Sequence, residues 1–94
     1  MISYYGKGFA GRRTASGERF DPGALTMAHR TLPFGTRVRI SLGDKHVIVR
    51  VNDRGPWRGK RIADLSWAAA RQLGLLQAGV AVGLIEVLEM GSTP

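Results

Sequence analysis

The sequence contains no cysteine, which limits both how the chain is stabilised and what chemistry it performs. Disulfide bonds are excluded, and so is a zinc site built from thiolates. The two histidines, His29 and His46, make a weak case for a metal site, so we expect neither a metal nor any other cofactor. A chain of 94 residues without disulfide bonds or a structural metal ion needs one well-packed hydrophobic core. We expect a single domain over residues 1–94.

Long apolar runs are also absent. No stretch approaches the roughly 18 apolar residues of a membrane-spanning helix, so we expect no transmembrane segment. The first residues, 1–5, indicate the start of a strand rather than a signal peptide. Taken alone, these two absences indicate a cytoplasmic protein; the alternative is a chain trimmed from a longer one.

Acidic and aromatic residues are scarce. Seven Asp and Glu stand against fourteen Lys and Arg, which gives a net charge of +7. Such a field attracts polyanions: nucleic acid, an anionic membrane surface or an acidic polysaccharide. Charge alone does not choose among these partners, and a solvated cationic surface without a dedicated partner is the remaining explanation. Aromatic residues make up only 7% of the chain and are not interleaved with arginine on one expected strand, which argues against nucleic-acid binding.

Glycine, by contrast, is abundant, with 13 residues spread along the chain, as is typical of a small β protein with frequent turns. Two segments, 36–42 and 45–52, place valine and isoleucine on alternate positions around Gly43-Asp44, and this pattern predicts a hairpin. Further strands are expected over 2–5, over 26–29 and, as one or two strands, over 80–90. Residues 6–23 are predicted to form a long loop, which in a compact domain is usually functional.

One helix is expected. Asp64-Leu65-Ser66 is predicted to open it with Ser66 as the N-cap, strong helix formers follow over 67–73, and Gly74 stands where a helix-ending glycine belongs. The sum is a mainly β chain of about six short strands with one short helix at about 66–73. This combination suggests a small closed barrel.

Three segments combine charged side chains with turn-forming residues. They are Thr-Ala-Ser-Gly-Glu-Arg-Phe-Asp over 14–21, Thr-Met-Ala-His-Arg-Thr-Leu-Pro-Phe-Gly-Thr over 26–36, and Val-Arg-Val-Asn-Asp-Arg-Gly-Pro over 49–56 with Arg-Ile-Ala-Asp-Leu-Ser at 61–66. Any one of them alone is weak. In this order and at these spacings they resemble the rare lipoprotein A (RlpA) family over nearly the whole chain and, more distantly, expansins and barwin-like proteins.

The resemblance implies a six-stranded double-psi β-barrel of the cell envelope, in the periplasm, that cleaves peptidoglycan glycan strands as a lytic transglycosylase. Carried over residue by residue, it implies Asp53 as the catalytic acid and His29 as a second catalytic-site residue. It also implies that Glu18 and Asp21 lie in the substrate groove. The sequence departs from the family pattern in Met27 and Trp57, and it holds no counterpart of the lipid-anchor cysteine or of the C-terminal peptidoglycan-binding domain of longer members.

The implied reaction needs a single carboxylate. Glycosidases usually use two, but in a lytic transglycosylase the C6 hydroxyl of the muramic acid attacks C1 of the same sugar and leaves a 1,6-anhydro end. Asp53 would protonate the glycosidic oxygen and then accept the proton of the C6 hydroxyl. Arg54 follows directly, and its side chain is expected to face away from Asp53 where the backbone stays extended, since neighbours on a strand point to opposite sides.

Each catalytic or groove residue also has a structural interpretation. Asp53 stands at a strand end before Gly-Pro, where an aspartate commonly caps a turn. His29 is also explained as a hydrogen-bonded, partly buried histidine. Glu18 and Asp21 are also explained as solvated loop carboxylates or as acceptors for the loop's own amides.

The remaining expected substrate contacts are Asn52, Tyr5 and Trp57. Tyr5 and Trp57 are expected to stack on sugar rings, although Trp57 would also suit the core. Asn52 either orients a substrate hydroxyl or caps a turn. Two further functions compete with the enzyme: a non-catalytic module that binds or loosens wall glycan in the manner of expansins and, less favoured, a nucleic-acid binder. We expect peptidoglycan glycan strands as the partner, no nucleic acid, and a monomer.

Overall fold

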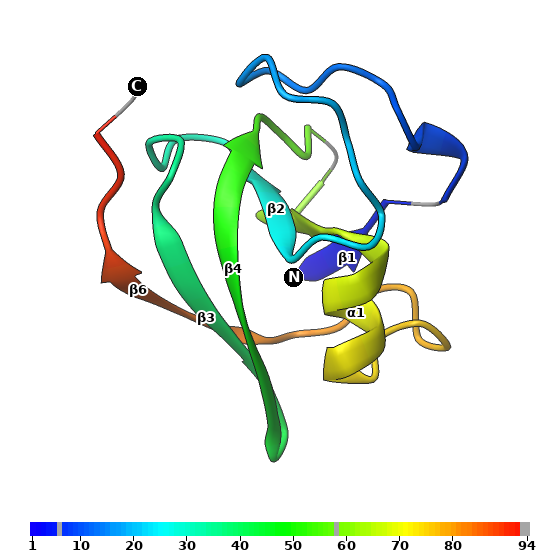
Figure 1. The fold of residues 1–94 in the computed structure, drawn as a ribbon. Helices are drawn as coiled ribbons and strands as arrows, with labels where there is room; N and C mark the ends of the chain where they lie inside the picture. The colour runs from blue at the N-terminus through cyan, green and yellow to red at the C-terminus, as the bar shows by residue number, and fades with distance from the viewer. Residues whose placement is uncertain (6, 58, 93–94) are drawn as a thin grey trace.

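The structure is a computed structural model that describes residues 1–5, 7–57 and 59–92 (Figure 1). Gly6, where the long loop is expected to begin, lies outside the described residues. In chain order the elements are β1 (Ile2–Tyr4), the short 3-10 helix η1 (Lys7–Phe9), β2 (Thr26–His29), β3 (Arg37–Leu42), β4 (Lys45–Asp53), β5 (Ala63–Leu65), the helix α1 (Trp67–Leu73) and β6 (Leu84–Glu89).

The six strands form one curled sheet in the order β1-β5-β2-β4-β3-β6. The pairs β1–β5 and β2–β4 are parallel, and the other three pairs are antiparallel. The sheet curls until its ends approach each other, because Ile2 of β1 exchanges two backbone hydrogen bonds of 2.8 and 3.0 Å with Ala81, just before β6. The prediction of a mainly β chain with six strands and one short helix is confirmed.

The core lies inside the curl. As the alternation predicts, β3 buries Val38 and Ile40, and β4 buries every second residue from Val47 to Val51. The helix α1 packs over this core with its own buried face of Ala69, Ala70 and Leu73. The described part of the chain contains no helix long and apolar enough to span a membrane.

One element, the start of the helix, differs from the expectation. Asp64 and Leu65 do not open the helix; they belong to β5, which lies between β1 and β2 and pairs with both. A strand of three residues is too short to display a period, and its extended form depends on two neighbours distant in sequence. The segment expected as one or two closing strands holds one strand, β6, in agreement with the prediction.

Ser66 joins the helix to the sheet. Its side chain is fully buried, and its hydroxyl accepts a hydrogen bond from the Ala69 amide at 3.3 Å as the helix N-cap, as predicted. The same hydroxyl donates to the carbonyl of Ala24 at 2.6 Å. The residue that begins α1 therefore also fixes the segment that leads into β2. At the other end Gly74 adopts the left-handed conformation, with φ of 77°, and ends the helix.

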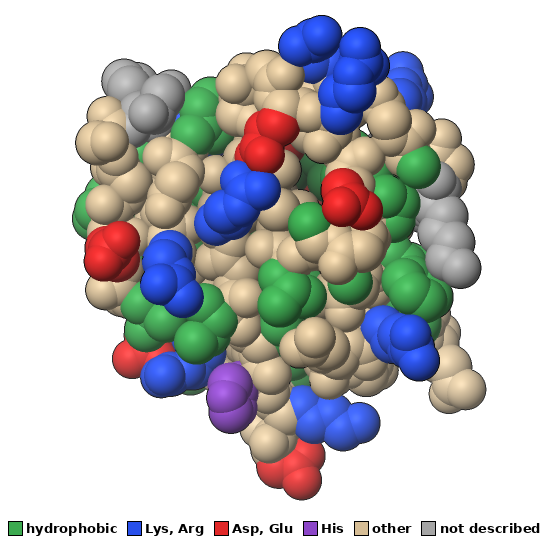
Figure 2. Space-filling view, in the orientation of Figure 1, with side chains coloured by type: hydrophobic (Ala, Val, Ile, Leu, Met, Phe, Trp, Pro, Cys, Tyr) green, Lys and Arg blue, Asp and Glu red, His purple; other side chains and the backbone are tan. Residues whose placement is uncertain are grey.

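On the face drawn in Figure 2, several cationic side chains group at the top and the others are scattered. Figure 2 shows Lys and Arg distributed over the visible face, with acidic and apolar side chains between them. Two arginines have carboxylate partners across the surface: Arg39 with Glu86, and Arg50 with Glu18.

Replacing Ser66 by alanine is expected to lower the free energy of unfolding by about 1–3 kcal/mol, because a helix amide and a loop carbonyl both lose their buried partner. Urea unfolding followed by circular dichroism measures this change. Ser41→Ala, at a half-buried position of β3, is the matched control and should stay within about 0.5 kcal/mol of the parent chain. Equal losses of unfolding free energy in the two variants would contradict the role of Ser66 as the residue that joins α1 to the segment before β2.

Candidate active site

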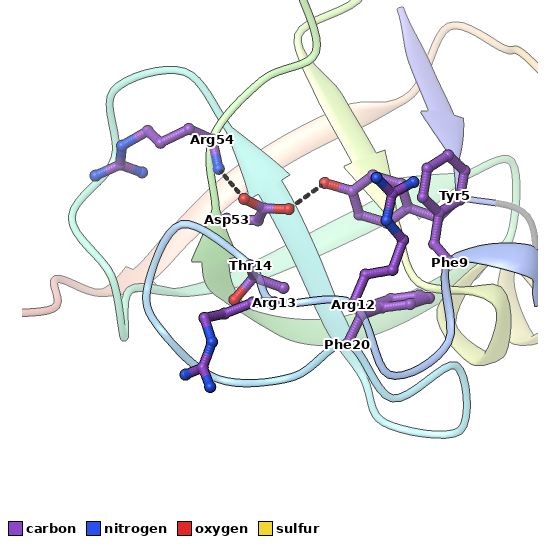
Figure 3. A pocket seen from close by; sticks show the side chains of 8 residues that line it. All are labelled: Tyr5, Phe9, Arg12, Arg13, Thr14, Phe20, Asp53 and Arg54. Atoms are coloured by element: carbon purple, nitrogen blue, oxygen red, sulfur yellow. Dashed lines mark hydrogen bonds between the residues drawn. The ribbon is translucent and has the colours of Figure 1, made fainter.

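A cleft of about 290 Å³ opens where the end of β4 meets the residue after β1 and the loop that follows (Figure 3). Asp53 is the last residue of β4, and Tyr5 directly follows β1. The described residues that line this cleft are Tyr5, Phe9, Arg12, Arg13, Thr14, Phe20, Asp53 and Arg54. The cleft therefore unites one predicted catalytic residue, Asp53, with one predicted substrate contact, Tyr5.

Three donors hold the Asp53 carboxylate. Its Oδ1 accepts hydrogen bonds from the backbone amides of Ala15 and Arg54, each at 2.8 Å. Its Oδ2 accepts a hydrogen bond from the Tyr5 hydroxyl at 2.7 Å (Figure 3). Because each carboxylate oxygen has about two lone-pair positions, Oδ1 is fully used by the backbone, whereas Oδ2 keeps one position.

Tyr5 is fixed as a hydrogen-bond donor. Its ring packs against Phe20 and Phe9, with centroid distances of 5.1 and 5.6 Å. Burial raises the pKa of the Tyr5 phenol well above its usual value, and the hydrogen bond to Asp53 raises it further. The phenol thus keeps its proton at any ordinary pH and serves Asp53 as a donor only.

Arg54 lies next to Asp53 in the chain, but its side chain points away from the carboxylate (Figure 3). Its guanidinium donates to the carbonyls of Leu32 at 2.8 Å and His29 at 3.2 Å, and it stacks over the Phe34 ring at 4.0 Å from the centroid. The expected divergence of the two neighbouring side chains is confirmed.

His29 organises the turn after β2. Its Nδ1 accepts hydrogen bonds from the amides of Thr31 and Leu32, each at 3.1 Å, so this nitrogen carries no proton. Burial lowers the pKa of His29, and the charges of Arg54 and Arg30 lower it further. The imidazole is not among the described residues that line the cleft, and its catalytic role stays a prediction.

Glu18 lies outside the cleft, in another hollow whose described lining includes Ser16, Glu18 and Arg50. Asn52 is not among the described lining residues of either hollow. Both guanidinium NH₂ groups of Arg50 bind the Glu18 carboxylate, one of them at 2.9 Å. The hydrogen bond from Arg50 lowers the pKa of Glu18, and one from Asn52 adds to this effect. Asn52 is only 4% exposed, and its backbone carbonyl accepts a hydrogen bond from the Ser16 amide at 3.2 Å. These contacts fix the loop that places the Ala15 amide within hydrogen-bonding distance of Asp53.

The last two predicted substrate contacts, Asp21 and Trp57, are not among the described residues that line the Asp53 cleft. Asp21 is exposed, and its Oδ1 accepts from the Gly23 amide at 2.9 Å, which is the local turn considered as the alternative. Trp57 is 71% exposed, which excludes a place in the core. Its ring lines a second hollow of about 470 Å³ that shares Tyr5, Phe9 and Arg54 with the Asp53 cleft. The two hollows adjoin, as an extended ligand would require.

Sequence reasoning missed several residues that line the cleft: Phe9, Arg12, Arg13, Thr14, Phe20 and Arg54. Within the expected long loop, the chain folds back on itself, since Phe20 donates to the Arg12 carbonyl at 2.7 Å and Gly11 donates to the Phe20 carbonyl at 2.8 Å. The available signal was the Arg12-Arg13 pair directly before the Thr-Ala-Ser-Gly-Glu motif. Within the described ranges, no cluster of three His, Asp or Glu side chains is arranged to hold a metal ion.

Comparison with known proteins identifies the family. The sequence profile of the family described as lytic transglycolase matches residues 1–85. The chain belongs to this family. A probable endolytic peptidoglycan transglycosylase RlpA of Nostoc sp. is 58% identical over 92 residues, which cover 94% of this chain and 25% of that protein. The endolytic peptidoglycan transglycosylase RlpA of Neisseria meningitidis serogroup A is 50% identical over 93 residues, covering 97% of this chain and 39% of that protein.

The chain is thus similar to one segment of these relatives and spans about a quarter of the Nostoc protein. Among solved structures, it is similar to the Streptomyces papain inhibitor, with a TM-score of 0.70 and 27% identity over 89% of this chain and 86% of that one. The resemblance to the RlpA family and the double-psi β-barrel fold that it implied are confirmed.

Replacing His29 by alanine is expected to lower the free energy of unfolding by about 1–2 kcal/mol at pH 7.5, because two amides lose their acceptor. The sign of the pH dependence follows from the lowered pKa. Below the usual value of 6.5 the unfolded chain binds a proton at His29 before the folded chain does, so the parent loses stability as pH falls. The difference in free energy of unfolding between the parent and His29→Ala should therefore become smaller from pH 7.5 to pH 5.

Urea unfolding at several pH values tests this expectation. His46→Ala removes the same side chain from an exposed position of β4 and should change stability little. A gap between parent and His29→Ala that stays constant with pH would rule out the neutral imidazole as the acceptor.

Proposed function

We propose that this domain cleaves the glycan strands of peptidoglycan as a lytic transglycosylase, leaves 1,6-anhydromuramic ends, and uses Asp53 as general acid and base. The observation that carries the proposal is the Asp53 carboxylate, fixed in an open cleft by three donors. The names of the relatives, which are endolytic peptidoglycan transglycosylases, support the same reaction.

The number of carboxylates favours transglycosylation over hydrolysis. Asp53 is the one acidic residue among the described residues that line its cleft. Hydrolases commonly need a second carboxylate to activate water or to form a covalent intermediate. A sugar hydroxyl that attacks within its own ring system needs neither, because its effective concentration is already high.

The proton moves through Oδ2 of Asp53. Oδ1 is occupied by two backbone amides, whereas Oδ2 has one free lone-pair position. In the proposed step Oδ2 gives its proton to the glycosidic oxygen as the bond from that oxygen to C1 breaks. The C6 hydroxyl forms a new bond to C1, and its proton returns to Oδ2, so the carboxyl group is restored and no water is consumed.

Tyr5 and His29 act as positioning residues in this proposal. The Tyr5 hydroxyl fixes the direction of the Asp53 carboxylate and so determines where the free lone pair of Oδ2 points. His29 holds the turn whose carbonyls bind the Arg54 guanidinium, and this anchors the chain immediately after Asp53. The exposed ring of Trp57 offers a stacking surface for a sugar in the adjoining hollow.

Glu18, Asn52 and Asp21 have supporting roles in the proposal, because their side chains stabilise the loop around the cleft. We further propose that residues 1–94 form one domain, that it acts as a monomer, and that it works in the periplasm of the cell envelope, where its substrate lies. The positive net charge of +7 suits a wall that carries carboxylates.

The alternative is a module that binds wall glycan without cutting it. One observation favours keeping this alternative: the same barrel shape occurs in the Streptomyces papain inhibitor, whose name describes inhibition rather than catalysis. A fold alone therefore does not imply an active centre.

Asp53→Asn is expected to abolish cleavage while glycan binding persists, because the amide cannot supply or accept the proton. Purified sacculi, intact and stripped of stem peptides, are digested, and the products are separated and weighed by mass spectrometry. The parent should release anhydromuramic ends, and the variant should be slower by at least about a hundredfold. Reducing ends would indicate a hydrolase, and intact co-sedimentation without products would favour the binding module.

Tyr5→Phe is expected to lower kcat about tenfold with little change in KM, because the Asp53 carboxylate loses the donor that orients it. Stability should fall by about 1 kcal/mol, since the ring contacts remain. Thr36→Val is the matched control: it removes a hydroxyl that accepts from the Gly91 amide at 2.9 Å, away from the cleft. If the two variants lose the same activity, the loss reflects stability rather than orientation.

A further inference from the structure

Three arginines line the Asp53 cleft, and two of them are occupied by the protein itself. Arg13 donates to the Gly17 carbonyl at 2.8 Å, and Arg54 donates to two carbonyls of the turn after β2. Both side chains point away from Asp53 in Figure 3. Neither guanidinium is therefore directed at a ligand in the cleft.

Arg12 differs from both. Within the described ranges its side chain makes no hydrogen bond and no ion pair, and its one assigned contact is a stack over the Phe9 ring at 5.3 Å from the centroid. In Figure 3 its side chain extends along the cleft toward the rings of Tyr5 and Phe9. Its backbone is fixed, since its amide donates to the Phe9 carbonyl at 3.1 Å. A cation with free donors thus stands at a defined place beside the proposed acid.

The carboxylates near Arg12 already have other partners. Asp53 has three donors. Glu18 is bound by both guanidinium NH₂ groups of Arg50, and Asp64, in the adjoining hollow, accepts a hydrogen bond from the Ser3 hydroxyl. Neither ion pair among the described residues involves Arg12, although an unpaired guanidinium fork is well matched to a carboxylate.

We propose that Arg12 binds a carboxylate carried by the glycan, and that the cleft thereby prefers a carboxylate-bearing strand to a neutral strand with the same sugar backbone. The inference deepens the proposed function, on which it rests for the nature of the ligand. In peptidoglycan such a carboxylate is supplied by the lactyl group of unsubstituted muramic acid or by a stem peptide. The Phe9 ring below the guanidinium restricts its orientation, which favours one geometry of the ion pair.

Binding is measured by titration calorimetry with the full chain carrying Asp53→Asn, so that the ligand is not consumed. The probes are a tetrasaccharide of alternating N-acetylglucosamine and N-acetylmuramic acid, the same compound with its carboxylates converted to primary amides, and chitotetraose. The acidic tetrasaccharide should bind about tenfold more tightly than the amidated one. Adding Arg12→Ala should remove this preference and leave the affinity for chitotetraose unchanged.

Arg37→Ala is the matched control, because it removes the same charge from an exposed position of β3 outside the cleft. If Arg12→Ala and Arg37→Ala weaken binding of the acidic probe equally, the general positive field explains the preference and the proposal is overturned. The proposal is also overturned if the Asp53→Asn chain binds the acidic and the amidated tetrasaccharides equally. The same holds if it does not measurably bind the acidic one. Arg12→Lys keeps the charge without the planar fork and should restore part of the preference.

A fourth probe, in which each lactyl carboxylate is linked to a dipeptide with a free terminal carboxylate, distinguishes the two sources. If this probe still binds more tightly than the amidated tetrasaccharide, Arg12 is assigned to the stem carboxylate. If it binds no more tightly, Arg12 is assigned to the lactyl carboxylate. The proposed function fails separately: if the parent binds the acidic probe through Arg12 but cuts no sacculi, cleavage is excluded and the Arg12 site stands. If sacculi are cut and Arg12→Ala binds like the parent, only the Arg12 site is excluded.

Discussion

The hydrogen bonds at the Asp53 carboxylate are the interaction on which the cleft depends. They join three parts of the chain: the end of β4, the loop at Ala15 and Tyr5 beyond β1. They act together with the Arg50–Glu18 ion pair and the hydrogen bond from the Ser16 amide to the Asn52 backbone carbonyl, which also hold the loop of residues 7–20 to β4. The same bonds leave one lone-pair position of Oδ2 open to the cleft, so the contact that assembles the site also defines where its proposed chemistry takes place.

The arginines explain how a small barrel without disulfides keeps its long connections ordered. Arg30 donates to the carbonyls of Pro56, Gly59 and Arg61, at distances of 2.6 to 3.3 Å, and Arg54 binds two carbonyls of the turn after β2. A guanidinium presents several donors in a fixed plane and can therefore hold more than one strand of backbone. Part of the +7 charge thus serves the structure, and only particular cations remain for a ligand.

The barrel itself does not specify an activity. The chain shares its shape with a Streptomyces papain inhibitor, yet the family profile and the relatives are those of transglycosylases. What distinguishes the site is a small set of side chains mounted on the strand ends and on one loop. Most of the residues that line the cleft lie on the segment that follows β1, so changes in that segment alter the cleft while the core stays the same.

Sequence alone determined the features that depend on local pattern: the β3–β4 hairpin, the helix between Ser66 and Gly74, and the family, through motifs of fixed spacing. It also singled out Asp53 and Tyr5, but not that they meet across 48 positions of the chain. Only the tertiary structure decided that contact, the three-residue strand β5, and which arginines are already bound to carbonyls. The reason is physical: each depends on partners remote in sequence, and a residue's own propensity or period holds no information about them.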